Sequence, residues 1–137
     1  MTPLAFDTSA AVAFVLRSHT AHPAVRRHAS GRDPALTTHS LAETYSVLTR
    51  LPGDARVAPL DAVRLLEADF SAPLAVPPDE LGALPRVLAT RGIAGGAVYD
   101  ALVGLAARAA AVPLLTRDAR AMATYAALDV DVELVPG

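Results

Sequence analysis

Four acidic residues, scattered along the chain, stand where carboxylates can do chemistry. Asp7 and Asp118 each follow a short apolar segment that is typical of a buried strand, and Glu43 and Asp100 stand near the starts of segments with helical periodicity. Parallel strands place their carboxyl ends at one edge of a sheet, which is where open α/β sheets bind ligands. Carboxylates that meet there without His or Cys select hard cations such as Mg²⁺ or Mn²⁺, and the chemistry of such clusters is mostly hydrolysis at phosphorus.

Asp100 gives a local reason to expect a metal ion. On a helical projection it shares a stripe with small or apolar residues, namely Gly96, Ala97, Val103, Gly104 and Ala107. A carboxylate buried among such neighbours must be paired, protonated or bound to a cation. Because the chain contains no Lys, a divalent metal ion is the most economical partner. The hydroxyls of Ser9 and Thr116 could then orient the ligands or a bound water molecule.

Each of the four acids also has an ordinary structural explanation. Asp7 and Asp118 could cap the helices that follow them. Glu43 could close a capping box with Ser40, and Asp100 could interact favourably with a helix N-terminus. Four separate coincidences explain the pattern less economically than one shared site does.

Short apolar segments alternate with longer helical segments along the whole chain. Strands are predicted at residues 4–7, 35–38, 73–76, 113–116 and 130–135. Helices are predicted at residues 10–16, 24–29, 40–51, 59–70, 80–90, 97–111 and 118–128. This alternation predicts an α/β fold, a three-layer sandwich in which a mostly parallel central sheet of four to five strands is flanked by helices. Residues 1–137 are expected to form a single domain.

Details of the helices can also be predicted. Thr8 or Ser9 is expected to cap the first helix, Asp79 to cap the fifth, and Pro85 to bend the fifth. Two helices have apolar stripes, which are Leu41, Tyr45 and Leu48 in one and Leu60, Val63, Leu66 and Phe70 in the other. The first stripe is expected to lie opposite Glu43. The second is expected to be core, or in part a groove for another chain.

The composition excludes several classes of protein. All 12 basic residues are Arg, so the chain lacks the Lys of a phosphate-binding loop and that of a Schiff-base enzyme. The formal net charge of −2 argues against bulk electrostatic binding of nucleic acid, although a few arginines and a bound cation could hold it locally. The absence of Cys excludes a disulfide framework and a thiolate metal site. Neither a signal peptide nor a membrane span is recognisable, so we expect a soluble, cytoplasmic protein.

Four short motifs occur in a fixed order along the chain. They are FDTSA at residues 6–10, SLAE at 40–43, YDAL at 99–102 and LTRD at 115–118. In order and spacing these motifs resemble those of PIN-domain nucleases, and most closely those of the VapC-type toxins of bacterial toxin–antitoxin pairs. The resemblance covers nearly the whole chain.

The resemblance implies a Mg²⁺- or Mn²⁺-dependent endoribonuclease that hydrolyses phosphodiester bonds in RNA. Asp7, Glu43, Asp100 and Asp118 match the acidic, metal-binding site of the family, and Thr116 stands in the position of its hydroxyl-bearing partner. The resemblance also implies a homodimer, and a cognate VapB-type antitoxin whose tail crosses the groove of the active site.

Other residues receive smaller roles. Ser9, Arg50 and Arg117 lie near the proposed ligands, so they are candidates for contacts with the substrate, the two arginines with its phosphates. His19 and His22 have a loose metal-ligand spacing, but a helix is expected to end beside them at Pro23, which makes ligation a minority interpretation. His28 and His39 are expected to be surface or cap residues.

Three alternatives remain to be weighed. A phosphatase of the haloacid-dehalogenase type also begins with an Asp-terminated strand, but it needs a second Asp where this chain has Ser9, and a Lys. A phosphoryl-receiver domain needs the same missing Lys. The non-enzymatic alternative is a catalytically silent PIN-like domain that binds RNA or a partner, and the retention of all four acids speaks against it.

Overall fold

The structure is a computed structural model and describes residues 1–136. Its strands are β1 (Thr2–Phe6), β2 (Arg32–Thr37), β3 (Ser71–Leu74), β4 (Leu114–Thr116) and β5 (Val132–Leu134). Its α-helices are α1 (Thr8–Val15), α2 (His22–His28), α3 (Thr38–Thr49), α4 (Pro59–Asp69), α5 (Pro78–Gly82), α6 (Leu84–Thr90), α7 (Ala97–Ala109) and α8 (Met122–Ala127). Two short 3₁₀ helices are η1 (Gly53–Ala55) and η2 (Ala119–Ala121).

The strands form one sheet in the order β3-β2-β1-β4-β5, and every pair is parallel. Strand β1 lies at the centre, where Ala5 is opposite both Ala35 of β2 and Leu114 of β4. This arrangement confirms the predicted parallel α/β sandwich, with β5 as the edge strand that closes the sheet. Because all strands run the same way, their carboxyl ends meet at one edge.

Alternation along β1 divides the core between the two faces of the sheet. Leu4 and Phe6 point into a cluster with α1, α2, α4 and the end of α3, whereas Ala5 points to the other face, towards α7 and Tyr125. All three β1 residues are fully buried. A strand buried on both faces must be apolar throughout, which is why residues 4–6 are recognisable in the sequence.

The start of α3 differs from the prediction. The helix begins at Thr38, and the capping box joins Thr37 and Ser40 rather than Ser40 and Glu43. The Ser40 hydroxyl also donates to the Phe6 carbonyl at the end of β1 (3.0 Å). The capping box therefore fastens the first turn of α3 to the central strand, and Glu43 is left free for other contacts.

The buried face of α3 also differs from the prediction. Ser40, Thr44 and Leu48 are buried, whereas Leu41 is only partly buried and Tyr45 is 37% exposed. The first turn packs so closely on the sheet that small polar side chains occupy the inner face. Leu48 was the only member of the predicted stripe that is fully buried.

The stripe on α4 is only partly core. Leu66 is buried, and Phe70 packs against Phe6 and Phe14 with ring centroids 5.4 and 5.6 Å apart. Leu60 and Val63 are instead 69% and 37% exposed.

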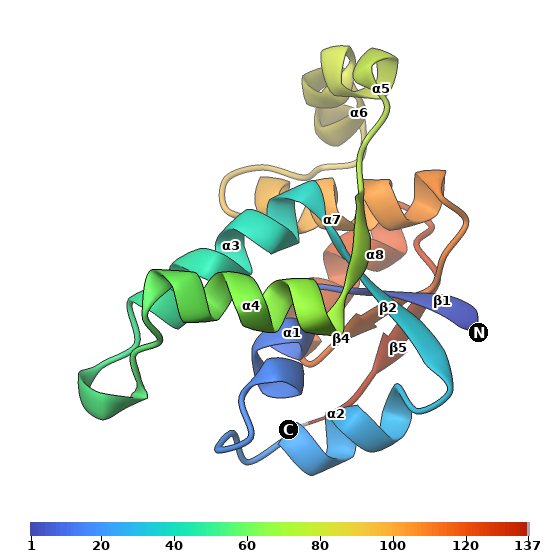
Figure 1. The fold of residues 1–137 in the computed structure, drawn as a ribbon. Coiled ribbons are helices and arrows are strands. Elements are labelled where there is room, and N and C mark those ends of the chain that lie inside the picture. Colours follow the sequence, from blue (N-terminus) through green and yellow to red (C-terminus); the bar gives the residue numbers. More distant parts are fainter. Residues whose placement is uncertain (137) are drawn as a thin grey trace.

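Pro85 separates two helices instead of bending one. Helices α5 and α6 meet next to it, and together they project from one end of the molecule (Figure 1). Asp79 does not cap this segment, because Pro77 is the N-cap and no side chain caps α5. The helix predicted at residues 118–128 is likewise divided, into η2 and α8.

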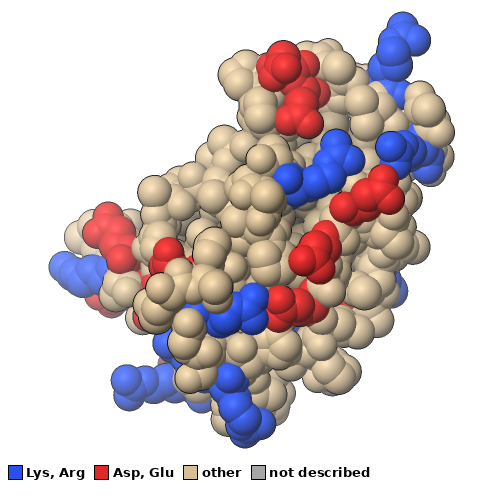
Figure 2. All heavy atoms as spheres, turned by 90° about the vertical axis from the view of Figure 1, so that its right-hand side faces the viewer, with Lys and Arg blue, Asp and Glu red and all other residues tan. Residues whose placement is uncertain are grey.

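Charges are mixed on the face that lies to the right in Figure 1, where β1 begins. Figure 2 shows acidic and basic side chains interspersed there. No helix in the described part of the chain is both long and apolar enough to cross a membrane.

An ion-pair network lies away from the carboxyl edge of the sheet. Glu133 of β5 accepts two bonds from the Arg32 guanidinium (3.1 and 2.9 Å), and its Oε1 lies 2.6 Å from Nε2 of His28. The Arg32 hydrogen bonds lower the pKa of the Glu133 carboxyl, with a smaller contribution from His28. The network ties the edge strand to β2 and α2.

Glu133→Gln should therefore lower the free energy of unfolding by about 1 kcal/mol near neutral pH. Because the folded-state pKa of Glu133 is depressed, its contribution is present above the unfolded value of 4.5 and is lost as the pH falls through the folded value. Urea unfolding at several pH values measures this. Asp61→Asn is the matched control, since it breaks a more exposed pair with Arg64 and should change stability less. Equal effects of the two variants at neutral pH would contradict the prediction.

Candidate active site

Asp7 lies at the carboxyl end of β1 and is only 5% exposed. It is the N-cap of α1, so the expectation that Thr8 or Ser9 would cap this helix was wrong. Its Oδ1 accepts from the backbone N–H of Ala10 (3.0 Å) and from the hydroxyl of Ser9 (2.6 Å). Its Oδ2 accepts from the Tyr125 hydroxyl (3.0 Å). Asp7 can therefore cap α1 and also act in a site, because the capping hydrogen bond and the two hydroxyl donors hold both carboxylate oxygens in fixed positions.

Burial raises the pKa of Asp7 above its ordinary value of 3.8. Hydrogen bonds from Ser9, Thr116, Ala10 and Tyr125 act in the opposite direction but do not cancel the effect of burial. All of these donors are neutral, so the charge of an ionised Asp7 is solvated by dipoles and not compensated by a cation. A carboxylate in this state favours the approach of a positive ion.

Hydroxyl groups join the end of β4 to the start of α1. The Ser9 hydroxyl accepts from the backbone N–H of Arg117 (2.9 Å) and lies 3.4 Å from the Thr116 hydroxyl. Thr116, which is fully buried, accepts from the backbone N–H of Asp118 (3.1 Å). Asp118 caps η2 by accepting from the N–H of Arg120 (3.0 Å). The structure therefore brings Ser9, Thr116 and Asp118 to the side of Asp7.

Glu43 reaches this edge from α3. Its Oε1 accepts a hydrogen bond from the hydroxyl of Thr8, the residue next to Asp7. Its Oε2 lies 3.8 Å from Nε2 of His39, one turn earlier on the same helix, and the Glu43 side chain is 45% exposed. Glu43 thus lies at the solvent-exposed border of the site.

Asp100 completes the group from the first turn of α7, where it is half-buried. Burial is the largest cause of its raised pKa, and the negative charges of Asp118, Asp7 and Glu43 raise it further. The other three predicted acids are therefore close enough to Asp100 for their charges to disfavour its ionisation. Burial and the charges of Asp7 and Asp100 likewise raise the pKa of Tyr125.

The donor set suits a hard divalent cation, because it consists of carboxylate oxygens gathered at one edge of the sheet. Nε of Arg120 lies 3.7 Å from Oδ1 of Asp118 and Nε2 of His39 lies 3.8 Å from Oε2 of Glu43, whereas Asp7 is bonded by neutral donors alone. Within residues 1–136, however, no three His, Asp or Glu side chains stand close enough together to form a ready-made metal cage. The assignment of Asp7, Glu43, Asp100 and Asp118 as metal ligands stays a prediction.

The two candidate phosphate contacts differ in position. Arg117 lies next to Asp118, and its positive charge helps to lower the pKa of His19 after burial, which is the largest cause. The Nε of Arg117 is buried and makes no hydrogen bond to any described residue. Arg50 is exposed at the end of α3, about 10 Å along the helix from Glu43, and its NH1 contacts Ser46. The structure thus brings the backbone of Arg117 to the site, where its N–H donates to Ser9, whereas the charge of its side chain acts on His19 and Arg50 lies further along α3.

Sequence reasoning missed Tyr125. It expected His39 to be a surface or cap residue, and in the structure the partly exposed His39 ring lies beside Glu43. Tyr125 belongs to the buried face of α8, and a buried Tyr hydroxyl usually finds a polar partner, which in this chain is Asp7. The sequence signal that could have placed His39 beside Glu43 is its position four residues earlier on the same helix. His19 and His22 instead make local contacts, to the N–H of Ala21 and the carbonyl of Ala13.

Gly104 on α7 makes room for Tyr125. A Cβ at this position would lie 3.1 Å from Cδ1 of Tyr125 and 3.0 Å from Cγ2 of Val130. Both distances are shorter than ordinary contacts, so the ring can reach Asp7 because α7 has no side chain there.

Tyr125→Phe should remove the donor to Oδ2 of Asp7 while leaving the ring in place. We expect about 1 kcal/mol less stability at low pH, where Asp7 is protonated, and a metal affinity about 10- to 100-fold weaker at neutral pH. Mn²⁺ titration followed by calorimetry checks the second effect. An unchanged affinity would show that Tyr125 only fills space.

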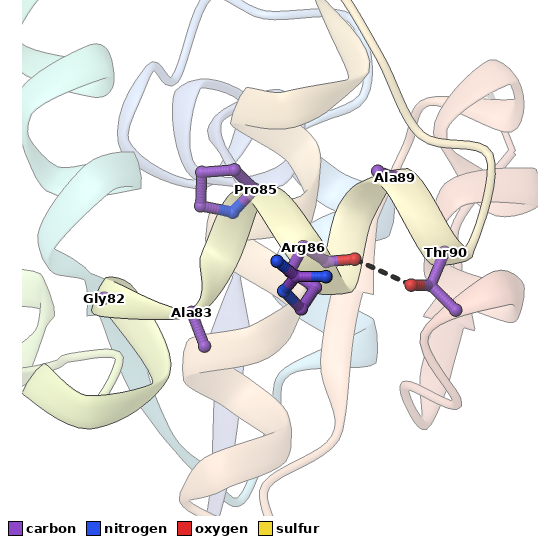
Figure 3. Close-up of a pocket in the computed structure, with 6 residues that line it drawn as sticks. All are labelled: Gly82, Ala83, Pro85, Arg86, Ala89 and Thr90. Atoms are coloured by element: carbon purple, nitrogen blue, oxygen red, sulfur yellow. Dashed lines mark hydrogen bonds between the residues drawn. The ribbon is translucent and has the colours of Figure 1, made fainter.

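The cavity on the projecting α5–α6 pair does not compete with this site. It has a volume of about 500 Å³ and is lined by Gly82, Ala83, Pro85, Arg86, Ala89 and Thr90 (Figure 3). It contains no carboxylate, and the Thr90 hydroxyl is engaged by the Arg86 carbonyl (2.8 Å). Its lining offers a single charged group, so the acidic edge of the sheet is the better candidate.

Comparison with known proteins agrees with this geometry. The sequence matches the PIN domain family over residues 4–128. It is 56% identical over 130 residues to Ribonuclease VapC27 of Mycobacterium tuberculosis, a match that covers 95% of each chain. It is 47% identical to Ribonuclease VapC40 of the same species, covering 96% of this chain and 98% of that one.

Solved structures show the same fold at low sequence identity. VapBC2 from Rickettsia felis, bound to a DNA fragment from its promoter, superimposes with a TM-score of 0.70 at 14% identity, covering 98% of this chain and 99% of that chain. VapC20 of M. tuberculosis, a sarcin-ricin loop cleaving toxin, superimposes with a TM-score of 0.64 at 21% identity, covering 88% and 93%.

Proposed function

Since this chain belongs to the PIN domain family, we propose that its acidic edge is the active site of a divalent-metal-dependent endoribonuclease of the VapC type. The observation that carries the proposal is the setting of Asp7. Its carboxylate is buried and is held only by neutral donors, and its charge, together with those of Asp118 and Glu43, raises the pKa of Asp100. Such a group is costly for the fold and is explained by a cation that joins it.

Asp7, Glu43, Asp100 and Asp118 would hold the Mg²⁺ or Mn²⁺ ion. When bound, such an ion supplies an activated water molecule and neutralises charge on the scissile phosphate. The protein's own groups do the positioning. Ser9 and Tyr125 fix the two oxygens of Asp7, and Thr8 orients Glu43.

Substrate contacts follow from the same layout. Arg117 is the nearest arginine to the acids by sequence and carries a buried Nε without a hydrogen-bond partner among the described residues, so it suits a phosphate. We assign Ser9 and Thr116 to the support of the reacting groups, because their hydroxyls link Asp7 to the Asp118 backbone. Arg50 lies too far along α3 for the scissile phosphate and would contact RNA further out.

Partners are proposed from the relatives. The solved neighbours include VapBC complexes, such as VapBC2 of Rickettsia felis and VapBC-5 of M. tuberculosis. We therefore propose that this chain acts in the cytoplasm as the toxin of a type II pair, with a VapB-type antitoxin and as a homodimer. Expression alone should arrest growth, and co-expression of the neighbouring antitoxin gene should relieve the arrest.

The test is cleavage of RNA by the purified protein. Wild type should produce discrete fragments with Mg²⁺ or Mn²⁺ and none after chelation, and Asp61→Asn, an exposed acid on α4, should behave like wild type. Cleavage that persists in a chelator would rule out the metal mechanism. Binding of RNA without cleavage under all ionic conditions would instead favour the catalytically silent alternative.

A further inference from the structure

Two aromatic rings are stacked beside the acids. The rings of His39 and Tyr99 are nearly parallel, at 11°, with centroids 5.5 Å apart. His39 comes from the first turn of α3, and Tyr99 from the first turn of α7. Neither ring takes part in the chemistry proposed above.

The ring pair flanks two predicted ligands. Tyr99 directly precedes Asp100, and Nε2 of His39 lies 3.8 Å from Oε2 of Glu43. A base stacked on this pair would therefore belong to a nucleotide next to the reacting phosphate.

Packing alone does not explain Tyr99. The residue is 57% exposed, whereas aromatic rings that stabilise a fold usually bury most of their area. His39, by contrast, is more than two-thirds buried at its side chain and supports the ring from behind. The pair thus presents one supported, open aromatic face to solvent.

The surroundings of the pair suit a base better than a phosphate. The adjoining carboxylates repel phosphates that carry no bound cation, whereas an aromatic face is uncharged. His39 also lines a groove of about 300 Å³ together with Thr38, Ala42, Ala75, Val76, Leu81 and Leu102. This lining has no other ionisable side chain, so the surface beyond the rings accepts apolar and planar groups.

We propose that Tyr99, supported by His39, stacks against a nucleobase of the RNA adjacent to the scissile phosphate and so positions the strand. The inference rests on the proposed ribonuclease function and adds the residue that recognises the substrate's bases. Stacking on an aromatic side chain tolerates any base, so Tyr99 is a positioning residue for unpaired RNA.

Fluorescence tests the stacking without any cleavage. The chain has no Trp, so Tyr99→Trp in an Asp7→Asn background creates a single reporter at the site. A single-stranded RNA of about 10 nucleotides should quench this emission. The same backbone carrying abasic positions should bind with little quenching, and an added His39→Ala substitution should weaken the quenching. Equal quenching by both probes, or none by either, would overturn the inference.

Steady-state kinetics test the role in catalysis. Tyr99→Ala should raise KM about tenfold with little change in kcat, and Tyr99→Phe, which keeps the ring, should resemble wild type. Tyr45→Ala on α3 is the matched control, because it removes another exposed tyrosine ring, two residues beyond Glu43 and so on another face of the helix.

These outcomes separate two failures. A wild-type protein that cuts no RNA contradicts the proposed function itself. A wild-type protein that cuts RNA, together with unchanged kinetics in Tyr99→Ala, contradicts only the positioning role.

Discussion

Asp7→Asn should abolish RNA cleavage and, in the absence of divalent ions, raise the melting temperature. Asparagine keeps an oxygen for the Ala10 N–H and the Ser9 hydroxyl, and its amide faces the Tyr125 oxygen. It removes the negative charge whose burial raises the pKa of Asp7. We expect a loss in kcat/KM of at least about a thousandfold, since several kcal/mol of transition-state stabilisation depend on the bound ion.

Two measurements made on the same samples check this prediction. Thermal melts in a chelator should show Asp7→Asn about 3 °C or more above wild type. Millimolar Mn²⁺ should raise the melting temperature of wild type and leave the variant unchanged, because an ion that binds only the native state stabilises it. Asp61→Asn likewise removes one negative charge, but an exposed one, and should behave like wild type in the chelator melts and in the Mn²⁺ melts. If metal-free Asp7→Asn melts below metal-free wild type, the burial of the Asp7 charge does not destabilise the fold.

A second large effect is expected when the pH is lowered. The proposed site binds a cation only when Asp7 and Asp100 are ionised, and both have a raised pKa. As the pH is lowered, activity should therefore begin to decline at a higher pH than it would if the two aspartates had ordinary pKa values. Below both pKa values kcat/KM should fall about tenfold per pH unit for each required ionisation, and so about a hundredfold for the two together.

The stability of the metal-free protein should change in the opposite direction. The folded-state pKa of Asp7 lies above its unfolded value of 3.8, so the folded state binds more protons between the two. Its favourable contribution is complete below the unfolded value and is lost as the pH rises through the folded value. Urea unfolding in a chelator from about pH 3 to about pH 7 should therefore show wild type losing stability relative to Asp7→Asn. Parallel curves for the two proteins would exclude a raised pKa at Asp7.

The parts of the site that could be predicted are those set by local pattern. The strand that ends at Phe6 is apolar on both faces, so the position of Asp7 at its carboxyl end followed from the sequence. The helix that presents Asp100 was recognisable from its periodicity, and its observed bounds differ from the predicted ones only at the end. Parallel topology then brings the acids to a common edge.

The parts that could not be predicted depend on tertiary contacts. The inner face of α3 carries Ser40 and Thr44, because the helix is anchored to β1 through a hydroxyl, and hydrophobic periodicity cannot identify buried polar residues. The partnership of Tyr125 with Asp7 spans most of the chain and depends on the gap at Gly104. Neither feature has a local signature.

The place of β1 in the sheet has a consequence for synthesis. Strand β1 is translated well before β4, with which it pairs, and the N–H of Asp7 donates to the Leu115 carbonyl (3.1 Å). Tyr125, which holds Oδ2 of Asp7, is translated later still. Ser9 and Ala10, which hold Oδ1 of Asp7, follow it directly in the chain, whereas the donor to Oδ2 comes 118 residues later. We therefore expect the proposed active site to assemble only after Tyr125 has been translated, because Oδ2 of Asp7 lacks this donor until then.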